Sequence, residues 1–206
     1  TGRLLDALEE LGLSKNTLVI YTSDNGPWNQ NKYTKNKKGH PKGSIFWGSS
    51  GPLRNGKGSC YEGGYRLPCI VRWPGKVPAG RESDAVFATI DFMPTFAKLS
   101  DFKIPADRVI DGIDQTDLLL GNSKKGRETF YFDRAGIRKG KWKYLKAKAH
   151  FYGYAREDDR PLEEELYDLE KDLGETTNLA KKHPKVVGEL RKLTEELPAY
   201  RPDEHR

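Results

Sequence analysis

Two adjacent residues with side-chain oxygens, Asp24 and Asn25, follow an apolar, β-branched run over residues 17–22. Such a run predicts a buried strand, and Gly26-Pro27 ends it at once. In an α/β sheet, ligands bind beyond the carboxyl ends of the strands. Carboxylate and amide oxygens suit hard cations such as Ca²⁺ and Mg²⁺, whereas a catalytic zinc site would require His or Cys. The pair is therefore a candidate for two ligands of a hard cation, and a strand-terminal Asx turn is the alternative.

Lys57 is the second candidate, because it lies between Gly56 and Gly58. Glycine on both sides lets the backbone approach a bound group closely while the ammonium group reaches it. A fixed cation there would stabilise the charge that builds on the outer oxygens of an anion under attack. Arg54 could face the same anion or form a structural pair, and we favour the pair. The alternative for Lys57 is an exposed lysine without a chemical role.

Glu62 and Arg66 lie in the pattern Glu-Gly-Gly-x-Arg-x-Pro over residues 62–68. They could contact a substrate directly. We favour a structural role, in which the two residues pair or bond to the backbone while the glycines permit a tight turn. That arrangement would hold Lys57 in place.

Three further residues could line the rim of a site: Trp28, His40 and Trp47. A histidine could donate a proton to a leaving group, but we favour a substrate-rim or solvent position for His40. The tryptophan faces would suit a sugar or an aryl group, or would pack the surrounding loop.

The elements that position these residues follow from periodicity. Residues 2–12 predict a helix that ends at Gly12, and residues 69–73 predict a second apolar strand, in which Cys69 is a small buried hydrophobe. Between the two strands, residues 26–67 show little periodicity, which is typical of a functional or disordered segment. Residues 92–100 predict a helix with Pro94 in its first turn.

The pattern changes after Gly121–Gly126, which predicts a boundary between a domain over 1–125 and a smaller one over 126–206. Beyond it, short aromatic-rich segments predict strands, and a final segment with apolar residues on one face predicts a helix; these are residues 129–132, 135–138, 142–146, 166–169 and 184–197.

The chain has 206 residues, of which 35% are hydrophobic and 32% charged, and its net charge is +6. This charge favours anionic partners, and part of it lies in a basic run over residues 32–42 that is either a solvated loop or a rim for an anionic substrate. Nucleic acid is disfavoured because no recognition motif accompanies the charge. No apolar run is long enough to span a membrane.

Taken in order, the segments 23–26, 51–57 and 61–68 resemble the type I sulfatases, enzymes of the alkaline-phosphatase-like superfamily that hydrolyse sulfate esters. Residues 165–169, Glu175 and residues 178–180 also resemble that family. The resemblance implies an α/β, alkaline-phosphatase-like fold. Residues 1–125 would form the C-terminal part of its central sheet domain, and residues 126–206 a small antiparallel subdomain with a terminal helix.

The resemblance also implies roles for the candidate residues. Asp24 and Asn25 would ligate Ca²⁺ together with carboxylates from an N-terminal half, and Lys57 would contact the sulfate group. Neither Cys60 nor Cys69 lies in the motif Cys-x-Pro/Ala-x-Arg, whose cysteine becomes the formylglycine nucleophile. We therefore expect the C-terminal portion of a sulfatase, with formylglycine in the missing half and no activity of its own. The sequence itself does not indicate a compartment, and the resemblance implies a periplasmic, extracellular or lysosomal one.

Two other functions remain open. A phosphoryl or phosphonate ester hydrolase of the same superfamily would share the fold but act on a more highly charged anion. A non-enzymatic module could instead dock acidic glycans on its basic loop. The identity of the substrate, a sulfated sugar or an aryl sulfate in our preferred interpretation, does not follow from the sequence. Because most of their sheet would be absent, the two apolar strands should expose apolar surface and edges that self-associate.

Overall fold

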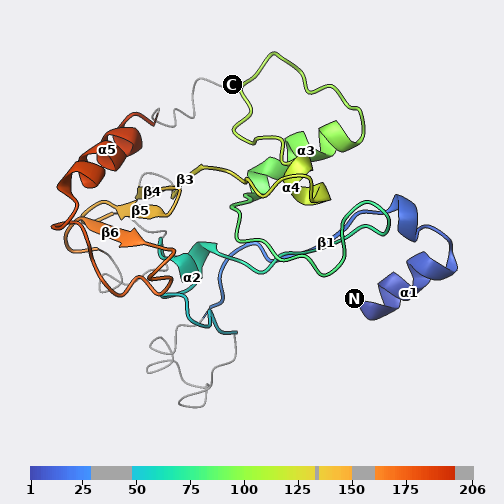
Figure 1. The fold of residues 1–206 in the computed structure, drawn as a ribbon, viewed down its shortest axis with the longest axis horizontal. Coiled ribbons are helices and arrows are strands. Elements are labelled where there is room, and N and C mark those ends of the chain that lie inside the picture. The colour runs from blue at the N-terminus through green and yellow to red at the C-terminus, as the bar shows by residue number, and fades with distance from the viewer. Residues whose placement is uncertain (29–47, 133–134, 150–160, 198–206) are drawn as a thin grey trace, which may run out of the picture. The chain divides into compact units, whose positions relative to one another are not determined.

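The structure is a computed structural model that describes residues 1–28, 48–132, 135–149 and 161–197 (Figure 1). The chain forms two compact units. The first contains Thr1–Thr22 and Pro68–Phe130, and the second contains Ser23–Leu67 and Tyr131–Arg206. The second unit therefore holds all the candidate residues for chemistry that the structure describes. The boundary expected at Gly121–Gly126 stays a prediction.

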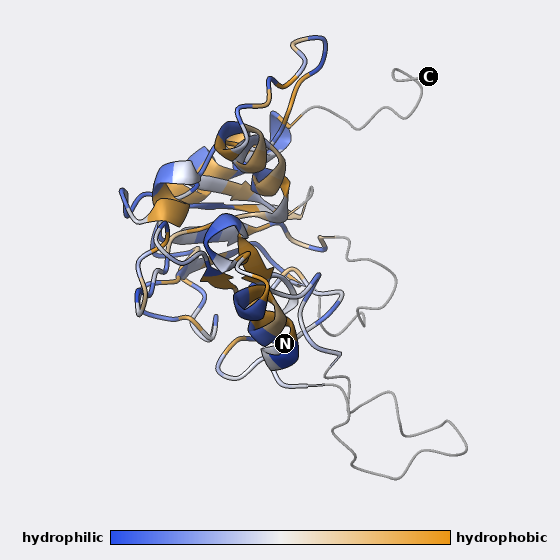
Figure 2. Cartoon of the chain, turned by 90° about the vertical axis from the view of Figure 1, so that its right-hand side faces the viewer, coloured by the Kyte–Doolittle hydropathy of each residue, from blue (hydrophilic) through white to orange (hydrophobic). Residues whose placement is uncertain are grey.

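The first unit opens with helix α1 (Gly2–Glu10), a 3₁₀ turn η1 (Ser14–Asn16) and strand β1 (Val19–Tyr21). Strand β2 (Ile70–Arg72) pairs with β1 in an antiparallel register that places Ile20 opposite Val71. The helix expected over 2–12 is thus confirmed. Figure 2 shows apolar and polar faces on the helix at the N label, yet no residue of α1 is buried.

The two strands are shorter than expected and are not buried in this chain. Tyr21 is 56% exposed and Ile70 is 62% exposed. Cys69, expected as a small buried hydrophobe, is exposed as well. An apolar run follows from the sequence, but its burial needs elements on both faces of the sheet, and the described chain does not supply them. The expectation of exposed apolar surface is confirmed.

The first unit continues with a 3₁₀ turn η3 (Thr89–Asp91) and helices α3 (Phe92–Leu99) and α4 (Thr116–Leu120). The buried residue Asp91, which has no exposed surface, connects these elements through its side chain. It accepts hydrogen bonds from the backbone N–H groups of Ala88 and Ile113, both at 2.9 Å, and it pairs with Arg127. Burial opposes its charge, but Arg127 and these N–H groups outweigh burial and lower the pKa of Asp91.

The second unit contains a short helix α2 (Glu62–Tyr65) and a sheet in the order β3-β4-β5-β6. The strands are β3 (Thr129–Tyr131), β4 (Gly136–Lys139), β5 (Trp142–Leu145) and β6 (Glu165–Asp168), and β4, β5 and β6 pair antiparallel. Helix α5 (Pro184–Glu195) packs on the sheet. Its Val187 and Leu190 join Ile137, Tyr144 and Leu166 in the core.

This sheet and its terminal helix confirm the elements expected after residue 126. The segments alternate strongly enough, and are separated by clear enough turns, for local pattern to predict them. Gly140, at the tip of the hairpin between β4 and β5, has a φ of 56°. Among the described residues, no helix is long and apolar enough to cross a membrane.

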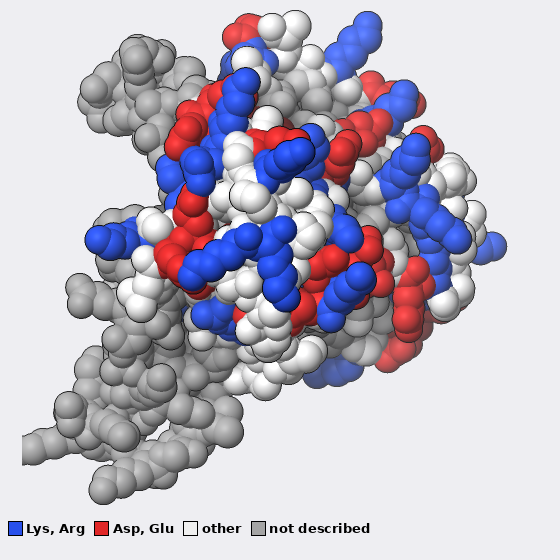
Figure 3. Space-filling view, turned by 60° about the vertical axis from the view of Figure 1, so that its left-hand side comes forward, with Lys and Arg blue, Asp and Glu red and all other residues white. Residues whose placement is uncertain are grey.

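Positive and negative side chains are intermingled on the face shown in Figure 3, over the part of the chain that the structure describes. The basic run over residues 32–42 that was expected as a rim, together with His40 and Trp47, lies outside the described residues. The described residues therefore form no single basic patch on that face.

Candidate functional site

Asp24 and Asn25 follow β1 and form a local hydrogen-bonded pair. The Asn25 side-chain amide donates to Asp24 Oδ2 at 2.5 Å, and the Ser23 hydroxyl lies 3.3 Å from Asp24 Oδ1. Asp24 is exposed and Asn25 is half-buried. A hydrogen bond from its own backbone N–H lowers the pKa of Asp24, and the Lys57 charge acts in the same direction. These interactions favour the charged form of the carboxylate.

The backbone after this pair is locked against α2. The Gly26 N–H donates to the carbonyl oxygen of Gly64 at 2.9 Å. The contact is so close that a Cβ atom on Gly26 would lie 1.8 Å from the carbonyl oxygen of Gly63. Only glycine fits there, which gives a packing reason for the Asp-Asn-Gly order that turn geometry alone does not.

Lys57 is joined to the same segment. Its N–H donates to the carbonyl oxygen of Pro27 at 2.9 Å. Gly58, which follows it, has a φ of 87°, a backbone conformation that favours glycine. Lys57 itself is half-buried, and its charge contributes to the lowered pKa of Asp24. The structure therefore joins the backbone that carries Lys57 to the segment that follows Asp24 and Asn25, and their roles in a site stay a prediction.

Helix α2 is anchored by buried charges. The Nζ atom of Lys143 lies 2.9 Å from Glu62 Oε1 and 2.8 Å from Glu175 Oε1. The other Glu175 oxygen accepts the Glu62 N–H at 2.7 Å. Lys143 has no exposed surface, and Glu62 and Glu175 are 3% and 1% exposed. We call Glu62, Lys143 and Glu175 the buried triad. Burial raises the pKa of Glu175, against the attraction of Lys143.

Arg54 takes part in a structural network. Its guanidinium group stacks 3.7 Å from the centre of the Tyr61 ring and donates to the Tyr167 hydroxyl and the Glu175 carbonyl oxygen, both at 2.9 Å. The Tyr61 hydroxyl in turn donates to Glu165 at 2.9 Å. These contacts favour the structural pair over an anion contact for Arg54.

The remaining sequence candidates lie around this core. The N–H of Arg66 donates to the backbone oxygen of Glu62 at 2.7 Å, and Trp28 is half-buried. The triad partners Lys143 and Glu175 were not predicted as site residues. A lysine between two aromatic residues of a strand, as in Trp142-Lys143-Tyr144, is a signal that could have drawn attention to Lys143.

The donor atoms fit part of a hard-cation site. Asp24 and Asn25 offer carboxylate and amide oxygens, whereas Ca²⁺ takes about six to eight oxygen ligands. Within the ranges that the structure describes, no group of three or more His, Cys, Asp and Glu residues is placed to hold a metal. Neither Cys60 nor Cys69 forms a disulfide bond.

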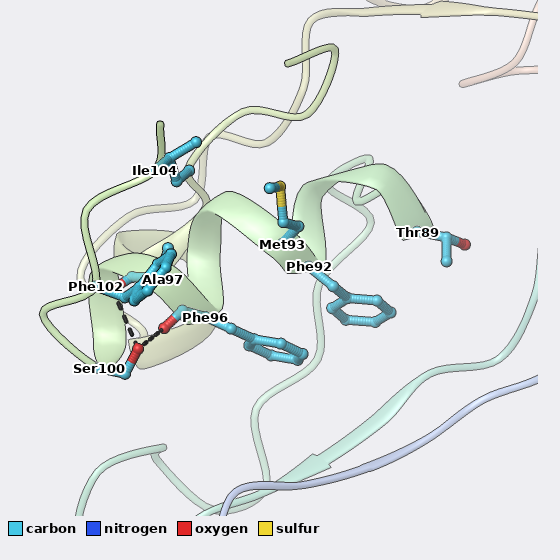
Figure 4. Close-up of a pocket in the computed structure, with 8 residues that line it drawn as sticks. All are labelled: Thr89, Phe92, Met93, Phe96, Ala97, Ser100, Phe102 and Ile104. Atoms are coloured by element: carbon cyan, nitrogen blue, oxygen red, sulfur yellow. Dashed lines mark hydrogen bonds between the residues drawn. The ribbon is translucent and has the colours of Figure 1, made fainter. Parts of the chain in front are cut away.

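A separate apolar hollow of about 570 Å³ lies in the first unit, along α3 (Figure 4). Phe92 and Phe96 project to one side of the helix, and Met93 projects away from them. Two lining residues, Thr89 and Ser100, are polar, and the Ser100 hydroxyl donates to the Phe96 carbonyl oxygen at 2.8 Å. The hollow has no ionisable lining residue and holds no candidate for chemistry.

Comparison with known families gives two matches. A family model described as Sulfatase matches residues 1–102. A second model, described as N-sulphoglucosamine sulphohydrolase, C-terminal, matches residues 56–201. Together the two matches cover both units and every candidate residue.

Individual proteins agree with these matches. An N-acetylgalactosamine-6-O-sulfatase of Bacteroides thetaiotaomicron is 36% identical over 207 residues, which cover 95% of this chain and 39% of that protein. Arylsulfatase A of Homo sapiens is 34% identical over 223 residues, which cover 93% of this chain and 40% of that protein. The chain thus spans about two fifths of the length of these relatives.

Solved structures show the same relation. A structure from a study of the metabolism of multiple glycosaminoglycans by Bacteroides thetaiotaomicron aligns with a TM-score of 0.76 at 35% identity, over 95% of this chain and 42% of that one. A structure in complex with its substrate, D-glucosamine-2-N,6-O-disulfate, aligns with a TM-score of 0.64 at 28% identity, over 95% of this chain and 36% of that one.

Proposed function

Because this chain belongs to the sulfatase family, of which it is a C-terminal-type portion, we propose that it supplies part of the active site of a sulfuric ester hydrolase. The observation that carries the proposal is the joining of two motifs. The Gly26 N–H donates to Gly64 and the Lys57 N–H donates to Pro27, so the backbone segments that carry a carboxylate-amide pair and a lysine are hydrogen-bonded to each other. Sulfate ester hydrolysis requires positive charge beside the outer oxygens of the sulfate group. A cation ligated by the carboxylate-amide pair would supply it on one side, and the ammonium group would supply it on the other.

Asp24 and Asn25 are the residues that would hold Ca²⁺. The pKa of Asp24 is lowered by its backbone hydrogen bond and by Lys57, which favours the charged carboxylate that a cation would bind. When bound, Ca²⁺ supplies Lewis-acid polarisation of the sulfate oxygens. The remaining ligands would come from outside this chain.

Lys57 would contact the sulfate group directly. Attack on sulfur builds negative charge on the outer oxygens, and a cation already in place lowers the barrier without reorganisation. The hydrogen bond from the Lys57 N–H to Pro27 fixes the backbone from which its side chain extends. The nucleophile, a formylglycine by family resemblance, would also come from outside this chain, because neither Cys60 nor Cys69 lies in its motif.

For the substrate we propose a sulfated sugar. One relative is an N-acetylgalactosamine-6-O-sulfatase, and one structural neighbour holds a disulfated glucosamine as its substrate. The net charge of +6 would favour such an anionic partner. Trp28 and His40 would lie at the substrate rim, and β1 and β2 would belong to the central sheet of an alkaline-phosphatase-like fold.

The test is complementation. The chain should show no sulfatase activity alone, and activity should appear when it is joined to an upstream half that carries a matured formylglycine, which we call the reassembled enzyme. Sulfated N-acetylgalactosamine and 4-nitrophenyl sulfate should both be assayed, with 4-nitrophenyl phosphate as the comparison. Turnover by the chain alone would contradict the proposal, and preference for the phosphate ester would favour a phosphoryl hydrolase.

A further inference from the structure

The buried triad is connected by consecutive contacts to the residues proposed to meet the substrate. We propose that Lys143 and Glu175 are positioning residues, which hold α2 and, through α2, set the positions of Asp24 and Lys57. The inference deepens the proposed function and rests on it for the roles of Asp24 and Lys57. The contacts themselves are independent of that function.

The first step is the buried cation. Lys143 Nζ lies between Glu62 at 2.9 Å and Glu175 at 2.8 Å, and 4.1 Å from the centre of the Phe132 ring. A charge without solvent contact is costly unless it is paired. Two carboxylates on one ammonium group therefore hold Lys143, Glu62 and Glu175 in a single arrangement. Arg138, 3.8 Å from the second Glu62 oxygen, balances the remaining negative charge.

The second step leads from the triad to α2. Lys143 holds the Glu62 side chain, while Glu175 Oε2 accepts the Glu62 N–H at 2.7 Å. That N–H belongs to the first turn of a helix, where backbone donors have no partner within the helix. Because one residue is held by both its side chain and its backbone, α2 can neither shift nor rotate without breaking a buried contact.

The third step leads from α2 to the site. The Gly63 N–H donates to the Arg54 carbonyl oxygen, and the Gly64 carbonyl oxygen accepts the Gly26 N–H, both at 2.9 Å. A Cβ atom on Gly63 would lie 2.2 Å from the Asn55 carbonyl oxygen. These backbones touch with no side chain between them. A displacement of α2 therefore moves the segments that carry Asp24 and Lys57.

A purely stabilising role explains the triad less well. Replacing a buried ion group with apolar residues is often neutral or stabilising, so buried charges are weak evidence for stability. The apolar core of this unit also forms elsewhere, between α5 and the sheet, around Ile137, Tyr144 and Leu166. A fixed geometry for α2 is what the triad adds.

The test uses amide hydrogen exchange in the 206-residue chain, measured by NMR for Lys143→Met and Glu175→Gln. The Gly26 and Lys57 amides should exchange about tenfold faster in Lys143→Met, because local opening becomes easier without unfolding the unit. Glu175→Gln keeps an acceptor for the Glu62 N–H and should show a smaller increase in the same direction. The Val187 amide, in α5, should be unchanged in both variants.

The matched control is Lys141→Met. Lys141 lies near the same hairpin tip and pairs with Asp168 at 2.8 Å, but it is 35% exposed and outside the triad. It should leave all of these amides unchanged. Unchanged exchange at Gly26 and Lys57 in both triad variants would overturn the inference, and so would an equal increase at Val187, which would mean general destabilisation. If Lys143→Met does not fold, Glu175→Gln alone decides.

A second measurement separates this inference from the proposed function. In the reassembled enzyme, Glu175→Gln should lower kcat and leave KM for the sulfate ester nearly unchanged, because Lys57 acts most strongly in the transition state. No activity in the unmutated reassembled enzyme, together with faster exchange at Gly26 and Lys57, would reject the function and keep the positioning role. Normal kcat in an active Glu175→Gln enzyme would reject the positioning role and keep the function.

Discussion

The backbone N–H of Lys57 donates to the carbonyl oxygen of Pro27 at 2.9 Å, so the lysine is tied to the residue that follows Asp24-Asn25-Gly26. Through this bond, two motifs that lie far apart in the sequence share one local geometry. The electrostatics of Asp24 reflect the same arrangement. Its pKa is lowered first by the hydrogen bond from its own backbone N–H, and the Lys57 charge acts in the same direction.

Gly26→Ala should destabilise the second unit. The new Cβ atom would lie 1.8 Å from the Gly63 carbonyl oxygen, so the backbone must move. We expect a loss of about 1–3 kcal/mol in the free energy of unfolding, measured by urea denaturation. Gly188→Ala is the matched control, because Gly188 lies in α5 and its Cβ atom would meet nothing within 4 Å. It should stabilise the chain by about 0.5–1 kcal/mol, and equal effects of the two changes would contradict the packing argument.

Asp24→Ala and Lys57→Ala should fail differently in the reassembled enzyme. Loss of a metal ligand should lower Ca²⁺ affinity, and excess Ca²⁺ should recover part of the rate. Loss of Lys57 should leave Ca²⁺ affinity nearly unchanged and cost about 2–4 kcal/mol in kcat/KM, by analogy with a lost oxyanion donor. Lys57→Arg should rescue poorly, because a planar fork does not replace a compact ammonium group between two glycines.

One outcome would reject the proposed contact between Lys57 and the sulfate group. Near-normal kcat/KM in Lys57→Ala would mean that Lys57 is an ordinary surface lysine. Lys15→Ala is a suitable control, because Lys15 is an exposed lysine of the first unit and should leave both the rate and the Ca²⁺ affinity unchanged.

Ca²⁺ should bind the chain alone only weakly. Asp24 and Asn25 supply two side-chain oxygens, and Ca²⁺ takes about six to eight ligands, so we expect a Kd of about 1 mM or weaker. Isothermal titration calorimetry, with Asp24→Ala as the comparison, measures it. A tight isotherm that survives Asp24→Ala would show that the ligands lie elsewhere in the chain.

Asp91 should make stability depend on pH in the acid range. Its pKa is lowered in the folded state, so its stabilising effect is fully present above the unfolded value of about 3.9 and is lost as the pH falls through the folded value. Urea unfolding between pH 7 and pH 2 should show this loss. Asp91→Asn should cost about 3 kcal/mol at neutral pH and flatten the acid limb; an acid limb of unchanged steepness would assign the loss to other carboxylates.

The exposed strand residues should make the chain self-associate. Tyr21 and Ile70 are paired opposite each other in β1 and β2 and are 56% and 62% exposed. Sedimentation should detect association that falls on dilution, with binding of an apolar dye. Ile70→Lys should reduce both, because a charge on an edge strand opposes pairing. A compact monomer at all concentrations, without dye binding, would contradict this prediction.

Local pattern was sufficient for several features of this protein. The alternation in residues 135–138 and 142–146, with the intervening Lys139-Gly140-Lys141, predicts a hairpin, and the structure contains it as β4 and β5. The order of the Asp-Asn-Gly and Glu-Gly-Gly motifs likewise predicts the family, which the family comparisons confirm. The hairpin depends on neighbouring residues, whose preferences act over a few positions along the chain, whereas the family follows from the resemblance of several separate motifs.

Only the tertiary structure decided which distant residues meet. The sequence alone predicts Glu62 as a structural residue, but its partners Lys143 and Glu175 lie in separate segments, and nothing local pairs a strand lysine with them. Burial was decided in the same way. The apolar run at 17–22 follows from the sequence, whereas the exposure of Tyr21 depends on what covers the sheet. Long-range pairing and burial are properties of packing between segments, so the sequence determined the elements and their motifs, and the fold determined their contacts.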